Sequence, residues 1–306
     1  MASSEQNQAT VSAPDTGVVI VNYRVPALLA DCLTSLAGSS ARDRLVACVV
    51  DSASGDGSVA RLMPQFPDTV FLELDRNLGY PRANNVGVAH LRDRFPDLRY
   101  MLFLNPDTVV PASALSNLLR VLERFPGAGA AGPRLELADG SIDWACRRGF
   151  PTPLVSLWHM ARLGRLLPRS RLFGRYRLTF LDERAVAEVD ALAGACMLVR
   201  CSVLDEIGLF DETFFMYGED IDLCYRMRTR GWRVIYDGSI DVRHLKRASS
   251  RQNPRAQREF VRAMRVFYEK HYARDMPGIG RFAVEAGLTF LNLVQRFRSG
   301  RREITA

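Results

Sequence analysis

Four short apolar runs, each followed by polar residues and then by a helical pattern, constrain the fold more than any other feature of the sequence. The runs are residues 18–21, 45–50, 70–74 and 100–104. Strands that alternate with helices predict βαβ units and a parallel sheet. Because the runs are almost entirely apolar, we expect helices to cover both faces of that sheet. In such α/β folds, ligands bind at the carboxyl ends of the strands.

Polar side chains stand at those carboxyl ends. Asn105 and Asp107 follow the fourth run and alternate, so both can face one ligand. A carboxylate at this place suits a hard divalent cation that bridges phosphates. The same residues could instead form an Asx turn that closes the strand. The other polar residues that follow a run are Asn22, Asp51, Asp75 and Asn77.

A cluster of acids opens the helix predicted over residues 219–230. Glu219, Asp220 and Asp222 follow an aromatic stretch that ends at Tyr217. One interpretation is a general base beside an apolar wall, where burial tunes its pKa. The alternative is helix-start charge with an Asp222–Arg226 pair four residues apart. His244 stands alone, and its imidazole could ligate a metal.

Several function classes lack their motifs in this sequence. No G-x-G-x-x-G follows a strand and no P-loop is present, which argues against a dehydrogenase or a P-loop nucleotidase. The six cysteines form no C-x-x-C pair, so we expect reduced thiols in the core. No apolar run approaches the ~18 residues of a membrane span, and the polar residues 1–16 are expected to be a flexible leader without a signal peptide.

The positive charge is concentrated at one end of the chain. The sequence has 41 Lys+Arg against 34 Asp+Glu, a formal net charge of +7. Residues 246–306 hold 14 of the bases and 5 of the acids, which leaves 27 bases and 29 acids elsewhere. Because residues 1–245 are nearly neutral, the charge distribution argues against a nucleic-acid-binding protein. The amphipathic pattern over 279–302 predicts either peripheral membrane contact or a helix docked on its own domain or on a homodimer partner.

Taken in order, the motifs resemble those of family 2 glycosyltransferases, most closely the rhamnosyltransferase-like branch. The resemblance covers residues 17 to about 250, where it rests on VVIVNYR, VDSASGDGS, DRNLGYPRANN, FLNPDTVV, GACMLVR and GLFDETFFMYGEDIDLCYRMRTRGW, together with His244. It implies a GT-A fold: a Rossmann-like nucleotide-sugar domain over 17–250 with a mostly parallel sheet. A basic helical extension over 251–306 would follow.

The resemblance also implies roles for individual residues. Asp220 matches the catalytic base, and Asp107 and His244 match the ligands of Mg²⁺ or Mn²⁺. Asn105 stands where the family has the first acid of its D-x-D motif. This departure leaves one negative charge fewer around the metal. The donor would be bound by Asn22, Tyr23, Asp51, Asp75, Asn77, Gly79, Arg82, Asn84 or Asn85, Asn105 and Asp107. Glu219, Tyr217 and Trp232 would lie on the acceptor side.

These observations predict an inverting, metal-dependent glycosyltransferase. It would move a sugar, rhamnose by the branch resemblance, from a dTDP- or UDP-linked donor to a glycan or a lipid-linked glycan. It would act in the cytoplasm or on the inner face of the cell membrane, and the arginine-rich segment 147–177 would be a flap over phosphates or a solvated loop. The alternative from another class is a non-catalytic partner subunit with the same fold.

Overall fold

The computed structural model describes residues 13–246, 254–282 and 284–289. Its main sheet has the order β3-β2-β1-β4-β10-β6-β11-β5, and β8 pairs with β11 off this path. The four predicted strands are confirmed as β1 (Thr16–Asn22), β2 (Leu45–Asp51), β3 (Thr69–Glu73) and β4 (Tyr100–Leu104). They pair in parallel, as continuous apolar strands predict.

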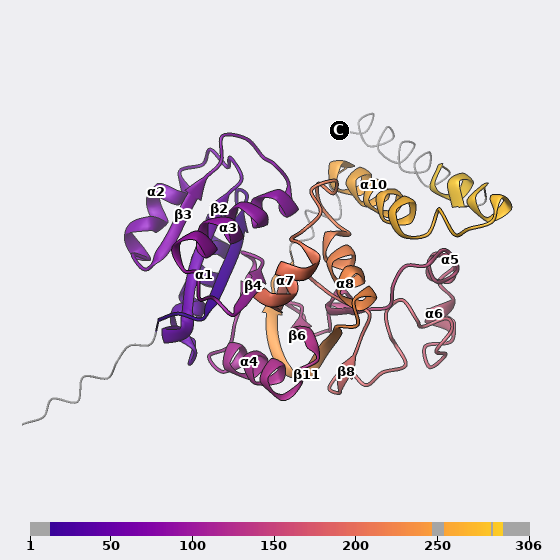
Figure 1. Ribbon diagram of the computed structural model, residues 1–306, viewed down its shortest axis with the longest axis horizontal. Helices are drawn as coiled ribbons and strands as arrows, with labels where there is room; N and C mark the ends of the chain where they lie inside the picture. Colours follow the sequence, from indigo (N-terminus) through magenta and orange to yellow (C-terminus); the bar gives the residue numbers. More distant parts are fainter. Residues whose placement is uncertain (1–12, 247–253, 283, 290–306) are drawn as a thin grey trace, which may run out of the picture.

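Helices connect these strands and cover the sheet, at the left of Figure 1. They are α1 (Pro26–Ala37), α2 (Ser58–Leu62), α3 (Tyr80–Arg94) and, after β4, α4 (Ala114–Arg124). Proline in the first turn of α1 and α3 favours helix starts there, because its missing N–H would have no partner anyway. Gly87 lets α3 approach β1 closely, since a Cβ at this position would lie 2.6 Å from Val19 Cγ1.

The second half of the sheet departs from the parallel pattern. β10 (Cys196–Arg200) lies antiparallel between β4 and β6 (Ala128–Glu136). The apolar pattern over residues 232–236 predicts a short last strand, but β11 (Arg233–His244) is longer: it runs parallel to β6, with a register shift between Asp237 and Asp241. The polar residues 237–239 interrupt the apolar pattern, which is why the predicted strand ends too early. The remaining strands are β5 (Thr108–Val109), β8 (Val186–Glu188) and a separate pair, β7 (Arg147–Arg148) with β9 (Ala191–Leu192).

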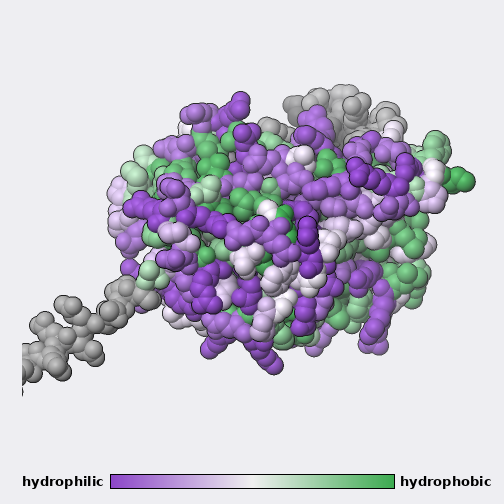
Figure 2. All heavy atoms as spheres, viewed as in Figure 1, coloured by the Kyte–Doolittle hydropathy of each residue, from purple (hydrophilic) through white to green (hydrophobic). Residues whose placement is uncertain are grey.

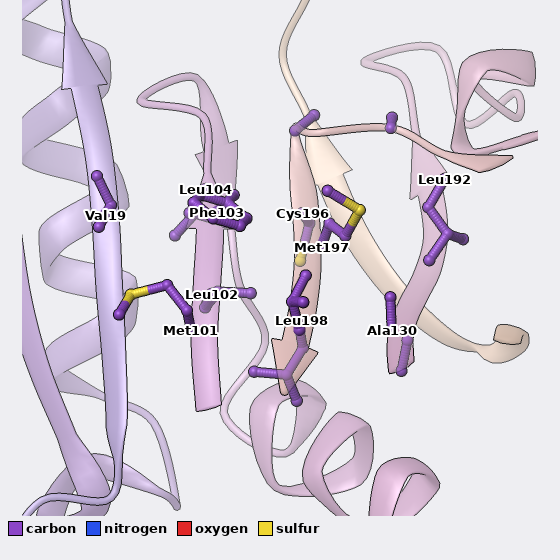
Figure 3. Packing of buried hydrophobic residues seen from close by; sticks show 14 of the residues in the cluster. Val19, Met101, Leu102, Phe103, Leu104, Ala130, Leu192, Cys196, Met197 and Leu198 are labelled. Carbon is purple, nitrogen blue, oxygen red and sulfur yellow. The ribbon is translucent and has the colours of Figure 1, made fainter. Parts of the chain in front are cut away.

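One core joins the two halves. Figure 3 shows Val19 of β1, Phe103 of β4 and Met197 of β10 on adjacent strands; their register places the three side chains on one face of the sheet, and all three are fully buried. The antiparallel strand β10 therefore extends the same hydrophobic layer rather than starting a second one. All six cysteines are free and buried within the described residues, as expected for reduced thiols.

The segment expected to be irregular contains two short helices, α5 (Pro153–Met160) and α6 (Leu163–Leu166), at the right of Figure 1. The Thr152 hydroxyl accepts a hydrogen bond from Val155 N and so caps α5. The other helices are α7 (Cys201–Ile207), α8 (Glu219–Thr229) and α10 (Pro254–His271), and residues 278–282 and 284–289 are also helical. None of the helices in the described ranges has the length and apolar character that crossing a bilayer requires.

Helix α10 packs on the rest of the protein through α8. Phe267 of α10 is buried in the core, and its neighbour His271 forms a 2.7 Å contact between Nε2 and Asp222 Oδ1. Asp222 also pairs with Arg226 at 2.8 Å, as the spacing predicted. The first part of the C-terminal extension is thus packed on its own domain. Most of the stripe predicted over 279–302 lies outside the described residues.

Candidate active site

A pocket of about 500 Å³ opens where β4 and β11 end and α8 begins. Helices α5 and α10 contribute its outer walls through residues such as His159 and Phe260. The pocket brings together six residues that the sequence singled out, although they come from distant parts of the chain. These are Asn105, Asp107, Tyr217, Glu219, Asp220 and His244.

Asp107 and His244 face each other because two short strand segments pair. In the β5–β11 pair Thr108 lies opposite His244, and Leu245 N donates to Asp107 O at 2.8 Å. This pairing brings His244 Nε2 to 3.3 Å from Asp107 Oδ1. The two predicted metal ligands therefore share one corner of the pocket.

Asp143 completes this corner, and the sequence did not single it out. Its Oδ2 lies 3.0 Å from His244 Nδ1 and 3.2 Å from Lys246 Nζ, and Oδ1 accepts from Ala145 N at 3.1 Å. Burial opposes the charge of this carboxylate, but His244 and Lys246 outweigh it and hold its pKa well below the usual range. In the sequence Asp143 resembles any aspartate that caps a turn, so nothing local distinguishes it.

His244 is buried between the two carboxylates. Burial alone would lower the pKa of the imidazole, but hydrogen bonds to Asp107 and Asp143 outweigh that effect and raise its pKa to about 9. When a cation replaces the proton on Nε2, Asp143 still holds the Nδ1–H and fixes the ring orientation, an arrangement common among metal-bound histidines. Asp143 thus positions His244 in either state.

These side chains fit a divalent cation that takes its remaining ligands from phosphates and water. Within the described ranges no cluster of three or more His, Cys, Asp or Glu side chains could hold a metal by itself. Mg²⁺ is commonly bound by one or two protein groups together with substrate phosphates. One carboxylate and one imidazole nitrogen in a pocket meet that requirement, and Asn105 adds an uncharged amide beside them.

Asp220 lies at the start of α8 and is held in a defined position. Its Oδ2 accepts from Arg148 Nη2 at 2.5 Å and from Gly194 N at 3.1 Å, and Oδ1 accepts from Ile221 N at 2.8 Å. A carboxylate has about four acceptor positions. One position on Oδ1 therefore stays available to a hydroxyl group in the pocket. Arg148, a buried residue at the start of the arginine-rich segment, was not predicted as its partner.

Glu219 has an environment different from that of Asp220. The side chain is buried, and its Oε2 has no hydrogen-bond partner among the described residues. Burial, and secondarily the negative charge of Asp220, raise the pKa of Glu219 well above its usual range. The environment therefore favours the neutral carboxyl over the carboxylate that a general base requires.

The residues predicted for the donor base and ribose form a separate polar group. Asn22 Nδ2 donates to Asp51 Oδ1 at 2.7 Å, and Asp51 also accepts from Ser54 N at 2.8 Å. Both side chains are buried and tie together the ends of β1 and β2. Tyr23 beside them is 43% exposed, and Asp75 is also exposed. None of these four residues lines the pocket described above.

The loop before α3 connects that group to the pocket. Asn77 Oδ1 accepts from Gly79 N at 3.0 Å, and Tyr80 N donates to Phe215 O at 2.8 Å. Gly79 has φ +85°, and a Cβ there would lie only 2.5 Å from Phe215 O. Only glycine allows this close approach, which brings the loop against the residues that precede Tyr217.

Three predicted side chains do not line the pocket. Trp232 precedes β11, so it stands at the opposite end of that strand from His244, and its indole N–H donates to Glu206 at 2.8 Å. This placement corrects the acceptor-side prediction. Asn84 is fully buried and donates to Tyr80 O on its own helix. Arg82 lies 3.4 Å from Glu212 at the surface.

Comparison with known proteins identifies the family. Residues 14–262 match the family described as glycosyltransferase like family 2. The chain is a family 2 glycosyltransferase. This result confirms the resemblance found in the motifs, and it favours an enzyme over a non-catalytic subunit.

Curated relatives of this glycosyltransferase include rhamnosyltransferases. An N-acetylglucosaminyl-diphospho-decaprenol L-rhamnosyltransferase of Mycobacterium tuberculosis is 34% identical over 244 residues, which cover 78% of each chain. Rhamnosyltransferase WbbL of Escherichia coli is 29% identical over 179 residues, covering 56% of this chain and 63% of WbbL. The predicted similarity to the rhamnosyltransferase-like branch is therefore confirmed.

A solved structure confirms the predicted GT-A fold of this glycosyltransferase. GalNAc-T7, crystallised with UDP, GalNAc and Mn²⁺, superposes with a TM-score of 0.57 at 15% sequence identity. The match covers 76% of this chain and 44% of GalNAc-T7. At this identity the likeness concerns the fold alone, a mixed α/β architecture with a largely parallel sheet.

Proposed function

We propose that this glycosyltransferase moves a sugar from a dTDP- or UDP-linked donor to a hydroxyl of a glycan or lipid-linked glycan, with inversion at the anomeric carbon. Rhamnose is the sugar that the curated relatives favour. The observation that carries the proposal is one pocket that holds both the Asp107–His244 pair and Asp220. A group that neutralises a leaving diphosphate and a group that accepts a proton are the two that such a transfer needs.

The Asp107–His244 corner would hold the diphosphate end of the donor. Mg²⁺ or Mn²⁺ bound there would stabilise the negative charge that develops on the leaving diphosphate. Asp107 supplies the anionic ligand, His244 supplies Nε2, and Asp143 keeps the ring in place through Nδ1. The uncharged Asn105 leaves the corner with one negative charge fewer than a pair of aspartates would give.

Asp220 would act as the general base. Its Oδ1 retains an acceptor position, and its carboxylate lines the pocket. An acceptor hydroxyl that donates to Oδ1 becomes a better nucleophile toward the anomeric carbon, an effect worth about 10²–10⁴ in rate. A single displacement from the side opposite the diphosphate inverts the anomeric configuration. Glu219 and Tyr217 would contact the acceptor.

The relatives and the pocket walls support a lipid-linked acceptor. The name of the mycobacterial relative includes N-acetylglucosaminyl-diphospho-decaprenol, a lipid-linked sugar. Apolar side chains of α5 and α10, among them Met160, Phe260 and Met264, line the outer part of the pocket. Contact with the cytoplasmic membrane surface through 279–302 fits Ile279 and Phe282, which are 89% and 77% exposed. A homodimer contact through the same helix is the alternative.

Donor contacts remain predictions that substitutions would test one at a time. We expect the base and ribose to lie along the carboxyl ends of β1–β3, outside the pocket described above, and the diphosphate to reach the pocket at Asn105 and Asp107. The residues concerned are Asn22, Tyr23, Asp51, Asp75, Asn77, Gly79, Arg82, Asn84, Asn105 and Asp107.

The experiment that tests the base is Asp220→Asn, with Asp205→Asn as a matched control. Asp205 lies on α7, where its exposed carboxylate pairs with Arg92 at 2.5 Å. Sugar nucleotides are screened for transfer with Mg²⁺ or Mn²⁺, donor affinity is measured by calorimetry, and the anomer of the product is assigned by NMR. We expect the Asp220 variant to lose about 10²–10⁴ in rate while donor affinity is retained. Equal rates in the wild type and both variants would refute the base, and a retained anomer would refute the single displacement.

A further inference from the structure

An exposed apolar surface covers α5, α6 and the turn that follows. Six large side chains there are between 45% and 76% exposed: Leu154, Leu157, Met160, Leu166, Leu167 and Leu172. They lie within 19 residues of sequence, and Figure 2 shows hydrophobic side chains at this right-hand end of the molecule. We call these six residues, together with Arg162, Arg165 and Arg169, the α5–α6 face.

The exposure does not come from a loosely packed segment. On the inner side Trp158 packs against Phe173 with ring centroids 5.5 Å apart, and His159 packs against Tyr176 at 4.5 Å. Leu154 and Leu157 lie three residues apart on α5 and form an outward stripe, which Met160 continues at the edge of the pocket. The segment is thus held from inside while its apolar stripe has no partner among the described residues.

Arginines surround this stripe, and no acid accompanies them. Residues 147–181 contain eight arginines and no Asp, Glu or Lys. Arg147 and Arg148 are buried and donate hydrogen bonds inside the protein. By contrast Arg162, Arg165 and Arg169 are exposed, and no carboxylate in the described ranges forms an ion pair with them. The face therefore combines exposed leucines with uncompensated positive charge.

We propose that the α5–α6 face docks the enzyme on the surface of a bilayer that contains anionic phospholipid. Leucines that enter the acyl boundary and arginines that meet lipid phosphates are the two features of interfacial binding segments. A second copy of the chain is a poorer partner, because a two-fold interface would bring the same arginines of both copies together. This site is separate in sequence from the predicted contact at 279–302.

Docking at this face would set the catalytic pocket at the membrane surface. Helix α5 presents Leu154 and Leu157 outward, whereas Ser156 and His159 of the same helix line the pocket. A lipid-linked acceptor could then keep its lipid in the bilayer while its sugar enters the pocket beside Asp220. This last step rests on the proposed function, but the docking itself does not.

The test is flotation of the full chain with vesicles of phosphatidylcholine alone or with 30% phosphatidylglycerol. One variant carries Arg162→Ser, Arg165→Ser and Arg169→Ser, and another carries Leu154→Ser and Leu157→Ser. Because one basic residue near an anionic leaflet is worth about fivefold, the arginine variant should partition about a hundredfold less onto anionic vesicles. The leucine variant should lose on the order of tenfold. Circular dichroism and thermal melting confirm that each variant is folded.

The matched control removes three exposed arginines from α2, α3 and α4, with Arg61→Ser, Arg94→Ser and Arg124→Ser. It changes net charge equally and should bind within twofold of the wild type. The proposal is overturned if the wild type does not float, or if the control loses as much binding as the α5–α6 arginine variant. It is also overturned if the leucine variant changes only the oligomeric state in light scattering. No donor or acceptor is present, so the outcome is independent of glycosyl transfer.

Discussion

Replacing Asp222 by Asn should both destabilise the protein and loosen α10. The Asp222 side chain is fully buried, and it is contacted by Arg226 at 2.8 Å, His271 at 2.7 Å and Lys270 at 2.7 Å. The last two residues belong to α10, so this carboxylate is the main electrostatic contact between α8 and the C-terminal extension. Without it, basic groups crowd together with no buried negative charge between them.

Two independent considerations give the magnitude. Burial opposes the carboxylate, but the hydrogen bond from His271 and the charge of Arg226 outweigh it and lower the pKa of Asp222 from 3.8 to about 2. At about 1.4 kcal/mol per pKa unit, that shift corresponds to about 2–3 kcal/mol of stability at neutral pH. Removing one partner of a buried ion pair typically costs about 3–5 kcal/mol. We therefore expect a loss of about 2–5 kcal/mol in the free energy of unfolding.

The assay is urea denaturation at pH 7, with hydrogen exchange of α10 as a local readout. The control is Asp205→Asn, whose exposed pair with Arg92 should contribute less than about 1 kcal/mol. Asp222 has a lowered pKa, so its contribution is present above about pH 4 and is lost as the pH falls through about 2. The variant should accordingly lose less stability than the wild type between pH 4 and pH 2.

A loss smaller than that of the control would refute the reasoning. So would unchanged hydrogen exchange in α10, because it would mean that apolar packing of Phe267 alone holds the helix. A double-mutant cycle with His271→Phe separates the two contributions. If the pair acts as described, the double variant should be less destabilised than the sum of the single ones.

Three further substitutions test other parts of the site. Glu219→Gln should remove a stability loss that the wild type shows as the pH rises from about 4.5 toward the raised pKa of Glu219, because the buried carboxyl favours the folded state only while protonated; melting curves from pH 5 to 9 measure it. Gly79→Ala should cost more than Gly57→Ala in urea denaturation: both have positive φ, worth about 1–3 kcal/mol, but only Gly79 also faces a backbone oxygen at 2.5 Å. Asp143→Asn should lower transfer at saturating Mn²⁺ and donor about ten- to a hundredfold, and wild-type rates would contradict its positioning role.

The first half of the fold could be predicted from the sequence because each strand is continuously apolar and each helix has its own start signal. The antiparallel placement of β10 could not, since its apolar run 196–200 fits either direction and only pairing with β4 and β6 decides. The early end predicted for β11 has a similar cause. The polar residues at 237–239 interrupt the pattern, whereas pairing with β6 continues beyond them.

The site likewise contains residues that could be predicted from the sequence and residues that could not. Asp107, Asp220 and His244 carry motif information, and the fold brings them to one pocket. Asp143 and Arg148 carry none, because a turn aspartate and one arginine among eight look alike in sequence whatever they contact. Trp232 was assigned to the acceptor side from its neighbourhood in sequence, but a strand of 12 residues separates it from the pocket. Proximity along the chain is a poor guide across an element of that length.

The pairing of β5 with the end of β11 has a consequence for biogenesis. Thr108 and His244 lie 136 residues apart in the sequence, so the corner that holds Asp107 against His244 has a very high contact order. During synthesis the first βαβ units emerge and can collapse long before residue 244 leaves the ribosome. A ligand that recognises this corner therefore binds only the finished sheet, and by mass action it stabilises that state alone. Nascent or truncated chains that contain the first strands cannot sequester donor or cation at this corner.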